Sequence, residues 1–111
     1  MLKPFHLRSS QAHSRLLELA KSDGQRHLVD LFKENPMRFD TMHCELPGFL
    51  YDWSKHRVTD RVMAALFDLA EEAGWKAGRD AMFGGDAINQ TEGRAVLHVA
   101  MRGEEEDGFS V

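Results

Sequence analysis

Residues 60–73 carry the strongest secondary-structure pattern in the chain, and that pattern is helical. Val62, Leu66 and Leu69 recur at helical spacing, so one face of this segment is apolar. Thr59 precedes the segment and is a good N-cap residue, and a glycine follows it as a stop signal. A chain of 111 residues has room for one modest core, against which this apolar face must pack.

Weaker helical patterns occur on both sides of this segment. The sequence predicts further helices over residues 11–22, 25–33, 75–83 and 92–102. The segment at 92–102 is apolar almost all round, which is typical of a helix buried between two layers.

The side-chain pattern of residues 39–53 differs from that of the helical segments and predicts a β-hairpin. Residues 39–46 alternate loosely between apolar and polar side chains, Pro47-Gly48 is a turn signal, and residues 49–53 are rich in aromatic side chains. A lone hairpin is marginal in water, so it should pack on the helices or pair with something outside this chain. The expected fold class is mainly α with a small β-hairpin, over a helical segment from 1 to 103. Residues 104–111 form an acidic tail that we expect to be disordered.

Composition excludes several classes of function. The net charge is −4 and the basic residues are scattered, which is atypical of a nucleic-acid-binding protein. No apolar run reaches the ~18 residues that a membrane span needs. Cys44 is the single cysteine, so no disulfide can form within the chain. These features favour a cytoplasmic protein.

The sequence gives no sign of a metal site or of a nucleophile. Six histidines lie far apart along the chain: His6, His13, His27, His43, His56 and His98. His43 and Cys44 are adjacent, and adjacent residues on a strand point to opposite faces. We therefore expect no metal, and we expect Cys44 to be a half-buried strand residue without a neighbouring base.

Three polar features could bind an anion. Gly84-Gly85-Asp86 is too short for a phosphate loop and predicts a plain turn. The densest polar cluster contains Asp52, Ser54, Lys55, His56 and Arg57, and a charged loop before a helix is its favoured interpretation.

The third feature is a stripe of Arg94, His98 and Arg102, at i, i+4 and i+8 of the predicted helix at 92–102. These side chains must face water, an acidic partner or a phosphate-like ligand, and solvent or a structural carboxylate is favoured.

One long stretch resembles a known family. Residues 85–102 read GDAINQTEGRAVLHVAMR, which closely resembles the segment "GEKIN, one residue, TEGRAVLHVALR" near the N-terminus of glucose-6-phosphate isomerases. Residues 50–57, LYDWSKHR, resemble the run DYSKNR of the same family, with Trp53 in place of Tyr and His56 in place of Asn. The resemblance covers residues 30–102.

The resemblance implies an enzyme that interconverts glucose 6-phosphate and fructose 6-phosphate. In that family a glutamate shuttles a proton through an enediol, a lysine or histidine helps to open the ring, and a Ser/Thr-rich loop holds the phosphate. The family needs no cofactor and is typically a cytoplasmic homodimer with two α/β sugar-isomerase domains. Those catalytic elements lie downstream of the segment that matches, so no catalytic, substrate-binding or metal residue is assigned in this chain.

Two hypotheses follow from the resemblance. In the first, the chain is an N-terminal fragment of the isomerase, which serves as scaffolding and is inactive alone. In the second, it is a stand-alone helical binding module without catalysis. A non-family alternative is an anion-binding protein that uses Arg94, His98 and Arg102. We also expect the isolated chain to self-associate, or to rearrange its N-terminal helices, because the helix at 92–102 would lack part of its cover.

Overall fold

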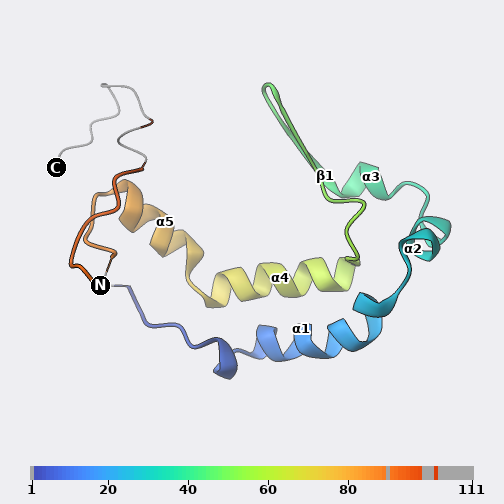
Figure 1. Ribbon diagram of the computed structural model, residues 1–111, viewed down its shortest axis with the longest axis horizontal. Coiled ribbons are helices and arrows are strands. Elements are labelled where there is room, and N and C mark those ends of the chain that lie inside the picture. The colour runs from blue at the N-terminus through green and yellow to red at the C-terminus, as the bar shows by residue number, and fades with distance from the viewer. Residues whose placement is uncertain (1, 90, 99–101, 103–111) are drawn as a thin grey trace. The chain divides into compact units, whose positions relative to one another are not determined.

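The computed structural model of the chain describes residues 2–89, 91–98 and 102 (Figure 1). The chain divides into two compact units. One spans residues 8–69, and the other combines residues 1–7 with residues 70–111. Five α-helices and one two-stranded antiparallel sheet lie within the described residues, which confirms a mainly α fold with a small β-hairpin.

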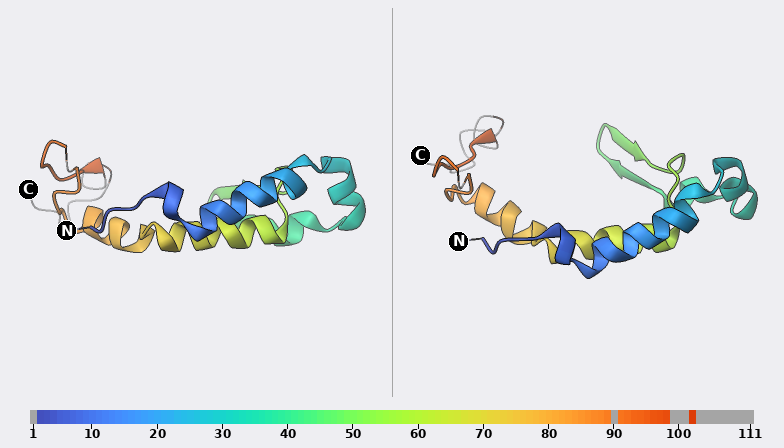
Figure 2. Two further views of the ribbon diagram at one scale, coloured as in Figure 1. Left: turned by 90° about the horizontal axis from the view of Figure 1, so that it is seen from below. Right: turned by 60° about the horizontal axis from the view of Figure 1, so that its bottom comes forward.

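Helices α1 (Gln11–Ser22) and α4 (Asp60–Glu72) lie side by side in the first unit (Figures 1 and 2). The Ser10 side chain caps α1 by accepting a 3.0 Å hydrogen bond from the backbone N–H of His13. The Thr59 hydroxyl likewise accepts from the backbone N–H of Val62 at the start of α4, so the predicted capping of α4 by Thr59 is confirmed.

The core of this unit is small. Its buried apolar side chains are Ala12, Leu19, Leu31, Met42 and Ala65. On α4 the fully buried residue is Ala65, whereas Leu66 is 40% exposed. Val62 and Leu69 of the predicted stripe are half-buried, but the buried face of α4 centres on Ala65 rather than on Leu66.

Helices α2 (Leu28–Glu34) and α3 (Arg38–Thr41) follow α1. The prediction of a helix at 25–33 was wrong at its start, because residues 23–25 form a short 3₁₀ turn and the His27 side chain caps α2 by accepting from the Val29 N–H. Helix α2 stops at Glu34, just before Asn35-Pro36, because a proline disfavours helical backbone in the residue before it.

Strands β1 (His43–Leu46) and β2 (Phe49–Asp52) form the hairpin, with His43 opposite Asp52 and Leu46 opposite Phe49. Gly48 takes a φ of 73° in the turn, a conformation that suits glycine. The strand prediction was too long at its start, since residues 39–41 belong to α3.

The second unit contains α5 (Trp75–Phe83), which matches the predicted helix at 75–83. Gly74 precedes it with a φ of 73°, and a turn at Gly84-Gly85 ends it, as expected. In the described part of the chain, every helix is too short or too polar to cross a bilayer.

The predicted helix at 92–102 was wrong over its first half. Thr91, Glu92 and Gly93 form a turn, and the backbones of Asn89 and Arg94 pair as an isolated antiparallel bridge. Gly93 has a φ of 64°, which a right-handed helix cannot contain. Helical geometry first returns at His98. Residues 99–101 and the acidic tail at 104–111 lie outside the described residues, so their predicted states are untested.

Candidate functional site

Asp23 is the most deeply placed charged group at the end of α1. It is 2% exposed and accepts a 2.6 Å hydrogen bond from the Thr59 hydroxyl. Arg61, on the first turn of α4, forms an ion pair with both carboxylate oxygens. The start of α1 and the end of α4 are also near each other, since Arg15 lies 3.9 Å from Asp68. Asp23 thus fixes the antiparallel pairing of the two helices.

The environment of Asp23 favours its charged form. The hydrogen bond from Thr59 lowers the pKa of Asp23 below its usual value, and the Arg61 guanidinium adds to this, although burial acts in the opposite direction. A carboxylate with several donors and a depressed pKa is a poor general base near neutral pH. Asp23 is therefore a structural ion.

Arg38, at the start of α3, has a comparable structural role, because it holds the loop before α4. It is 3% exposed, and its guanidinium donates to the backbone carbonyls of Ser54, His56 and Val58 at 3.0–3.1 Å. The Phe32 ring lies 5.5 Å from the guanidinium carbon. One planar group with several donors therefore holds three backbone carbonyls of an otherwise irregular loop in place.

The polar cluster predicted at 52–57 is this same loop. Asp52 accepts from the backbone N–H of Ser54 at 2.8 Å and from Lys55 at 3.4 Å. The hydrogen bonds from Ser54 lower the pKa of Asp52 below its usual value, with a smaller effect from Lys55. Ser54 is buried, while Lys55, His56 and Arg57 are exposed. The favoured interpretation, a charged loop before a helix, agrees with this geometry.

The stripe of Arg94, His98 and Arg102 is not formed as predicted. Arg94 lies in the bridge with Asn89 rather than in a helix, so it does not share a helical face with His98. All three residues are exposed. The Asn89 side-chain oxygen accepts from the Glu92 N–H at 3.3 Å, which stabilises the turn that replaces the helix start.

No metal site is found in the described part of the chain, where no three His, Cys, Asp or Glu residues come together. His27 caps α2, and the His43 ring stacks on Phe39 with centroids 4.2 Å apart. Cys44 lies on β1 as predicted, but it is exposed rather than half-buried, as are the other residues of β1 after His43.

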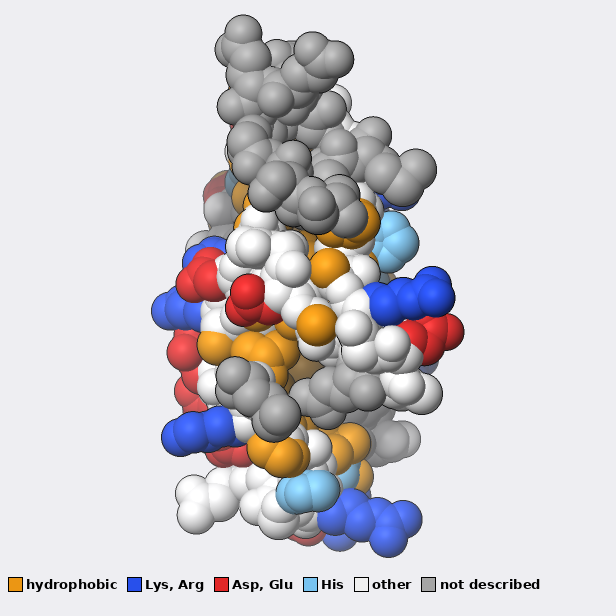
Figure 3. Space-filling view, turned by 90° about the vertical axis from the view of Figure 1, so that its left-hand side faces the viewer, with side chains coloured by type: hydrophobic (Ala, Val, Ile, Leu, Met, Phe, Trp, Pro, Cys, Tyr) orange, Lys and Arg blue, Asp and Glu red, His pale blue; other side chains and the backbone are white. Residues whose placement is uncertain are grey.

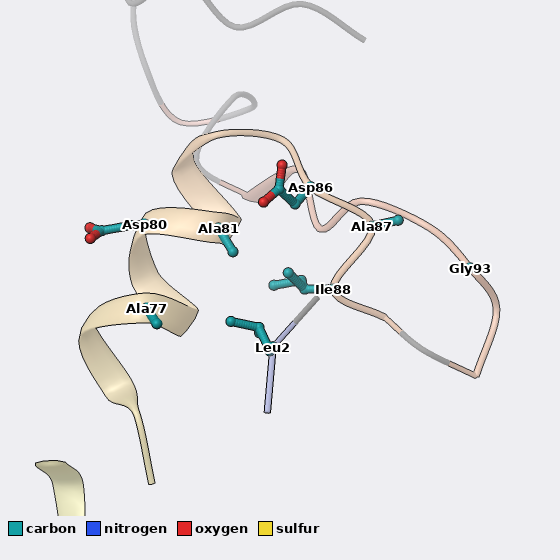
Figure 4. A pocket seen from close by; sticks show the side chains of 8 residues that line it. All are labelled: Leu2, Ala77, Asp80, Ala81, Asp86, Ala87, Ile88 and Gly93. Atoms are coloured by element: carbon teal, nitrogen blue, oxygen red, sulfur yellow. The ribbon is translucent and has the colours of Figure 1, made fainter. Parts of the chain in front are cut away.

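A cavity of about 950 Å³ lies in the second unit (Figure 4). The side chains of Leu2, Ala81 and Ile88 point toward one another there, whereas the Asp80 carboxylate points away and pairs with Arg79 at 2.9 Å. The described lining residues include no Lys, Arg or His, so nothing in the lining would neutralise a phosphate group.

Charges of both signs are mixed over the face shown in Figure 3, where basic and acidic side chains alternate among apolar ones.

Sequence reasoning missed Asp23 and Arg38. An aspartate after a helix and an arginine after a proline are common on surfaces, and their burial depends on residues 16 to 38 positions away. A buried aspartate could have been suspected only by pairing it with Thr59 and Arg61, which the cap of α4 places on one helical turn.

A family model described as phosphoglucose isomerase matches residues 52–111, more than half of the chain. The chain belongs to the phosphoglucose isomerase family. It is 47% identical over 87 residues to the glucose-6-phosphate isomerase of Methylococcus capsulatus, which is 78% of this chain and 16% of that protein. It is 53% identical over 76 residues to the enzyme of Deinococcus radiodurans, which is 68% of this chain and 14% of that protein.

A third relative is glucose-6-phosphate isomerase 2 of Chromobacterium violaceum, 40% identical over 86% of this chain and 18% of its own length. The chain thus spans less than a fifth of the length of these isomerases. The loop held by Arg38 lies largely within residues 50–57, and the turn at Asn89–Arg94 lies within residues 85–102, the two stretches that resemble the family.

Proposed function

We propose that this chain supplies the N-terminal framework of a glucose-6-phosphate isomerase and carries none of its catalytic groups. The observation that carries the proposal is the match itself: identity of 40–53% over most of this chain, confined to 14–18% of the length of the relatives. The whole enzyme would interconvert glucose 6-phosphate and fructose 6-phosphate in the cytoplasm, as a homodimer without a cofactor.

The geometry supports a framework role. The buried charged groups bond to other groups of the same unit: Asp23 to Thr59 and Arg61, and Arg38 to three backbone carbonyls. Groups saturated in this way orient segments of chain and are not available to move a proton or to bind a sugar phosphate.

A chimera tests the proposal. The matched 76-residue segment of the Deinococcus radiodurans isomerase is replaced by the corresponding segment of this chain, and isomerase activity is measured in a coupled assay. We expect kcat/KM within about tenfold of the unmodified enzyme, because no residue that contacts the reacting atoms is exchanged. The same enzyme with the segment deleted is the control and should be inactive. A folded chimera without activity would contradict the framework role, and a stand-alone binding module would then be favoured.

A further inference from the structure

The β1–β2 hairpin has one apolar and one polar face. Residues paired across the strands share a face, as do alternate residues along each strand. The register therefore places Cys44, Leu46, Phe49 and Tyr51 on one face, which is called here the apolar hairpin face. His43, Glu45, Leu50 and Asp52 lie on the other.

The apolar hairpin face is open to solvent. Leu46, Phe49 and Tyr51 are 57–62% exposed, and Cys44 is exposed as well. The rings of Phe49 and Tyr51 stack with centroids 6.0 Å apart, so the face presents a continuous aromatic surface. Within their unit, the strands extend away from the helices (Figures 1 and 2).

The polar face, by contrast, makes contacts within its own unit. The ring of His43 stacks on Phe39, and Asp52 accepts hydrogen bonds from Ser54 and Lys55. The base of the hairpin is held too, since the Trp53 N–H donates to the Met42 carbonyl at 3.0 Å. The hairpin is thus fixed at its base, through His43, Asp52 and Trp53, and its apolar face stays largely open to a partner.

The size of the face decides between possible occupants. Side chains of these types, exposed to this degree, present on the order of 400 Å². A specific interface between separate proteins buries ~800 Å² on each partner. The face is therefore too small to hold a second copy of the chain by itself. It is large enough to dock against another part of the same polypeptide, because docking within one chain does not cost the translational and rotational entropy of a separate molecule.

We propose that the apolar hairpin face docks against the part of the isomerase polypeptide that the relatives possess beyond the matched segment. More than four-fifths of the length of those relatives lies outside the match. The polypeptide that could cover the face is therefore much longer than the matched segment. The partner is an apolar surface that excludes water from Phe49, Tyr51 and Cys44. This inference rests on the proposed framework function.

The rate at which the Cys44 thiol is alkylated shows whether the apolar hairpin face is covered. Alkylation of Cys44 by iodoacetamide is followed by peptide mass spectrometry, first in the isolated chain and then in a chimera that carries residues 2–111 before the remainder of the Deinococcus radiodurans isomerase. We expect alkylation to be at least tenfold slower in the chimera, because a covered thiol is inaccessible. Equal rates in an active chimera would overturn the inference and leave the framework function standing. An inactive chimera would contradict both.

Phe49→Asp and Leu50→Asp form a matched pair of variants. The two residues are neighbours on β2 with nearly equal exposure, 57% and 55%, but they lie on opposite faces. In the chimera, Phe49→Asp should restore rapid alkylation of Cys44 by at least about tenfold, whereas Leu50→Asp should change the rate less than about threefold. Leu46→Asp, on the other strand, is a second variant of the apolar face. Unchanged circular dichroism of each variant in the isolated chain shows that the hairpin unit still folds.

Two results would overturn the proposal. In the first, Phe49→Asp and Leu50→Asp have equal effects on Cys44 in the chimera. In the second, the isolated wild-type chain protects Cys44 increasingly as its concentration rises and sediments as a dimer, which would identify a second copy as the occupant.

Discussion

Asp23 and Arg38 each join segments that are distant in the sequence. Asp23 bonds to residues 36 and 38 positions later, and Arg38 bonds to carbonyls 16 to 20 positions later. Both side chains are nearly inaccessible to water. If either were removed, water could not readily replace the hydrogen bonds that its partners lose. The stability of the first unit should therefore depend on these two side chains more than on its surface ion pairs.

Asp23→Ala should lower the free energy of unfolding by about 2–3 kcal/mol, because Thr59 and Arg61 lose their shared acceptor. Urea titration followed by circular dichroism measures the change. The control is Asp68→Ala, which removes an ion pair of 3.9 Å between exposed side chains and should cost less than about 0.5 kcal/mol. Equal losses in the two variants would show that Asp23 does not hold α1 to α4.

Stability should also fall in acid through Asp23. Since the folded state lowers the pKa of this carboxyl, the folded state binds fewer protons than the unfolded state as pH falls. The stabilisation is complete above about pH 4, near the ordinary pKa of aspartate, and is lost as pH falls through the lowered value. We expect the melting temperature of Asp23→Asn to vary less than that of the wild type between about pH 5 and about pH 2. Parallel curves for the two proteins would be evidence against this linkage.

Arg38→Ala should destabilise the chain by about 2–4 kcal/mol, since three backbone carbonyls lose their donor. Arg38→Lys keeps the charge but cannot reach three acceptors with one ammonium group, so it should recover only part of the loss. Arg57→Ala, at an exposed position of the same loop, is the control and should change stability by less than about 0.5 kcal/mol. Full recovery with lysine would show that charge, and not the planar fork of donors, is what the loop needs.

At the scale of the elements, the helices with clear caps were predictable from local signals. Ser10 and Thr59 mark the starts of α1 and α4, and Pro36 explains why α2 ends where it does. The errors occurred where a local signal had two meanings. Thr91 with Glu92 resembles a helix start, but the positive φ of Gly93 makes a turn instead. The burial of Ala65 in place of Leu66 could not be predicted, because it depends on which side chains pack against α4 in the folded unit.

Two glycines at α5 offer a paired test of backbone conformation. Gly74 has a φ of 73°, so Gly74→Ala should cost about 1–2 kcal/mol even though nothing lies within 4 Å of the added Cβ. Gly78 lies inside the helix with equal space around it, so Gly78→Ala should stabilise the chain by about 0.5–1 kcal/mol. Thermal unfolding of both variants measures the two changes. Shifts of the same sign would mean that α5 does not begin at a left-handed residue.

At the scale of the whole molecule, the buried polar groups hold residues 8–69 together, and the apolar hairpin face points to a partner. The family could be recognised from residues 85–102 and 50–57 because whole motifs are retained, and the comparisons confirm it. The open face of the hairpin could not be foreseen from the sequence, since alternation in β1 and β2 shows which residues share a face and not whether that face is covered.

The most direct test of the framework role is an isomerase assay of the isolated chain. The chain is purified from a host that lacks its own glucose-6-phosphate isomerase, and the conversion of fructose 6-phosphate is followed in a coupled assay at high protein concentration. The account predicts a rate equal to that of buffer, because the chain supplies structure and no catalytic group. Turnover that rises in proportion to the purified chain would contradict it.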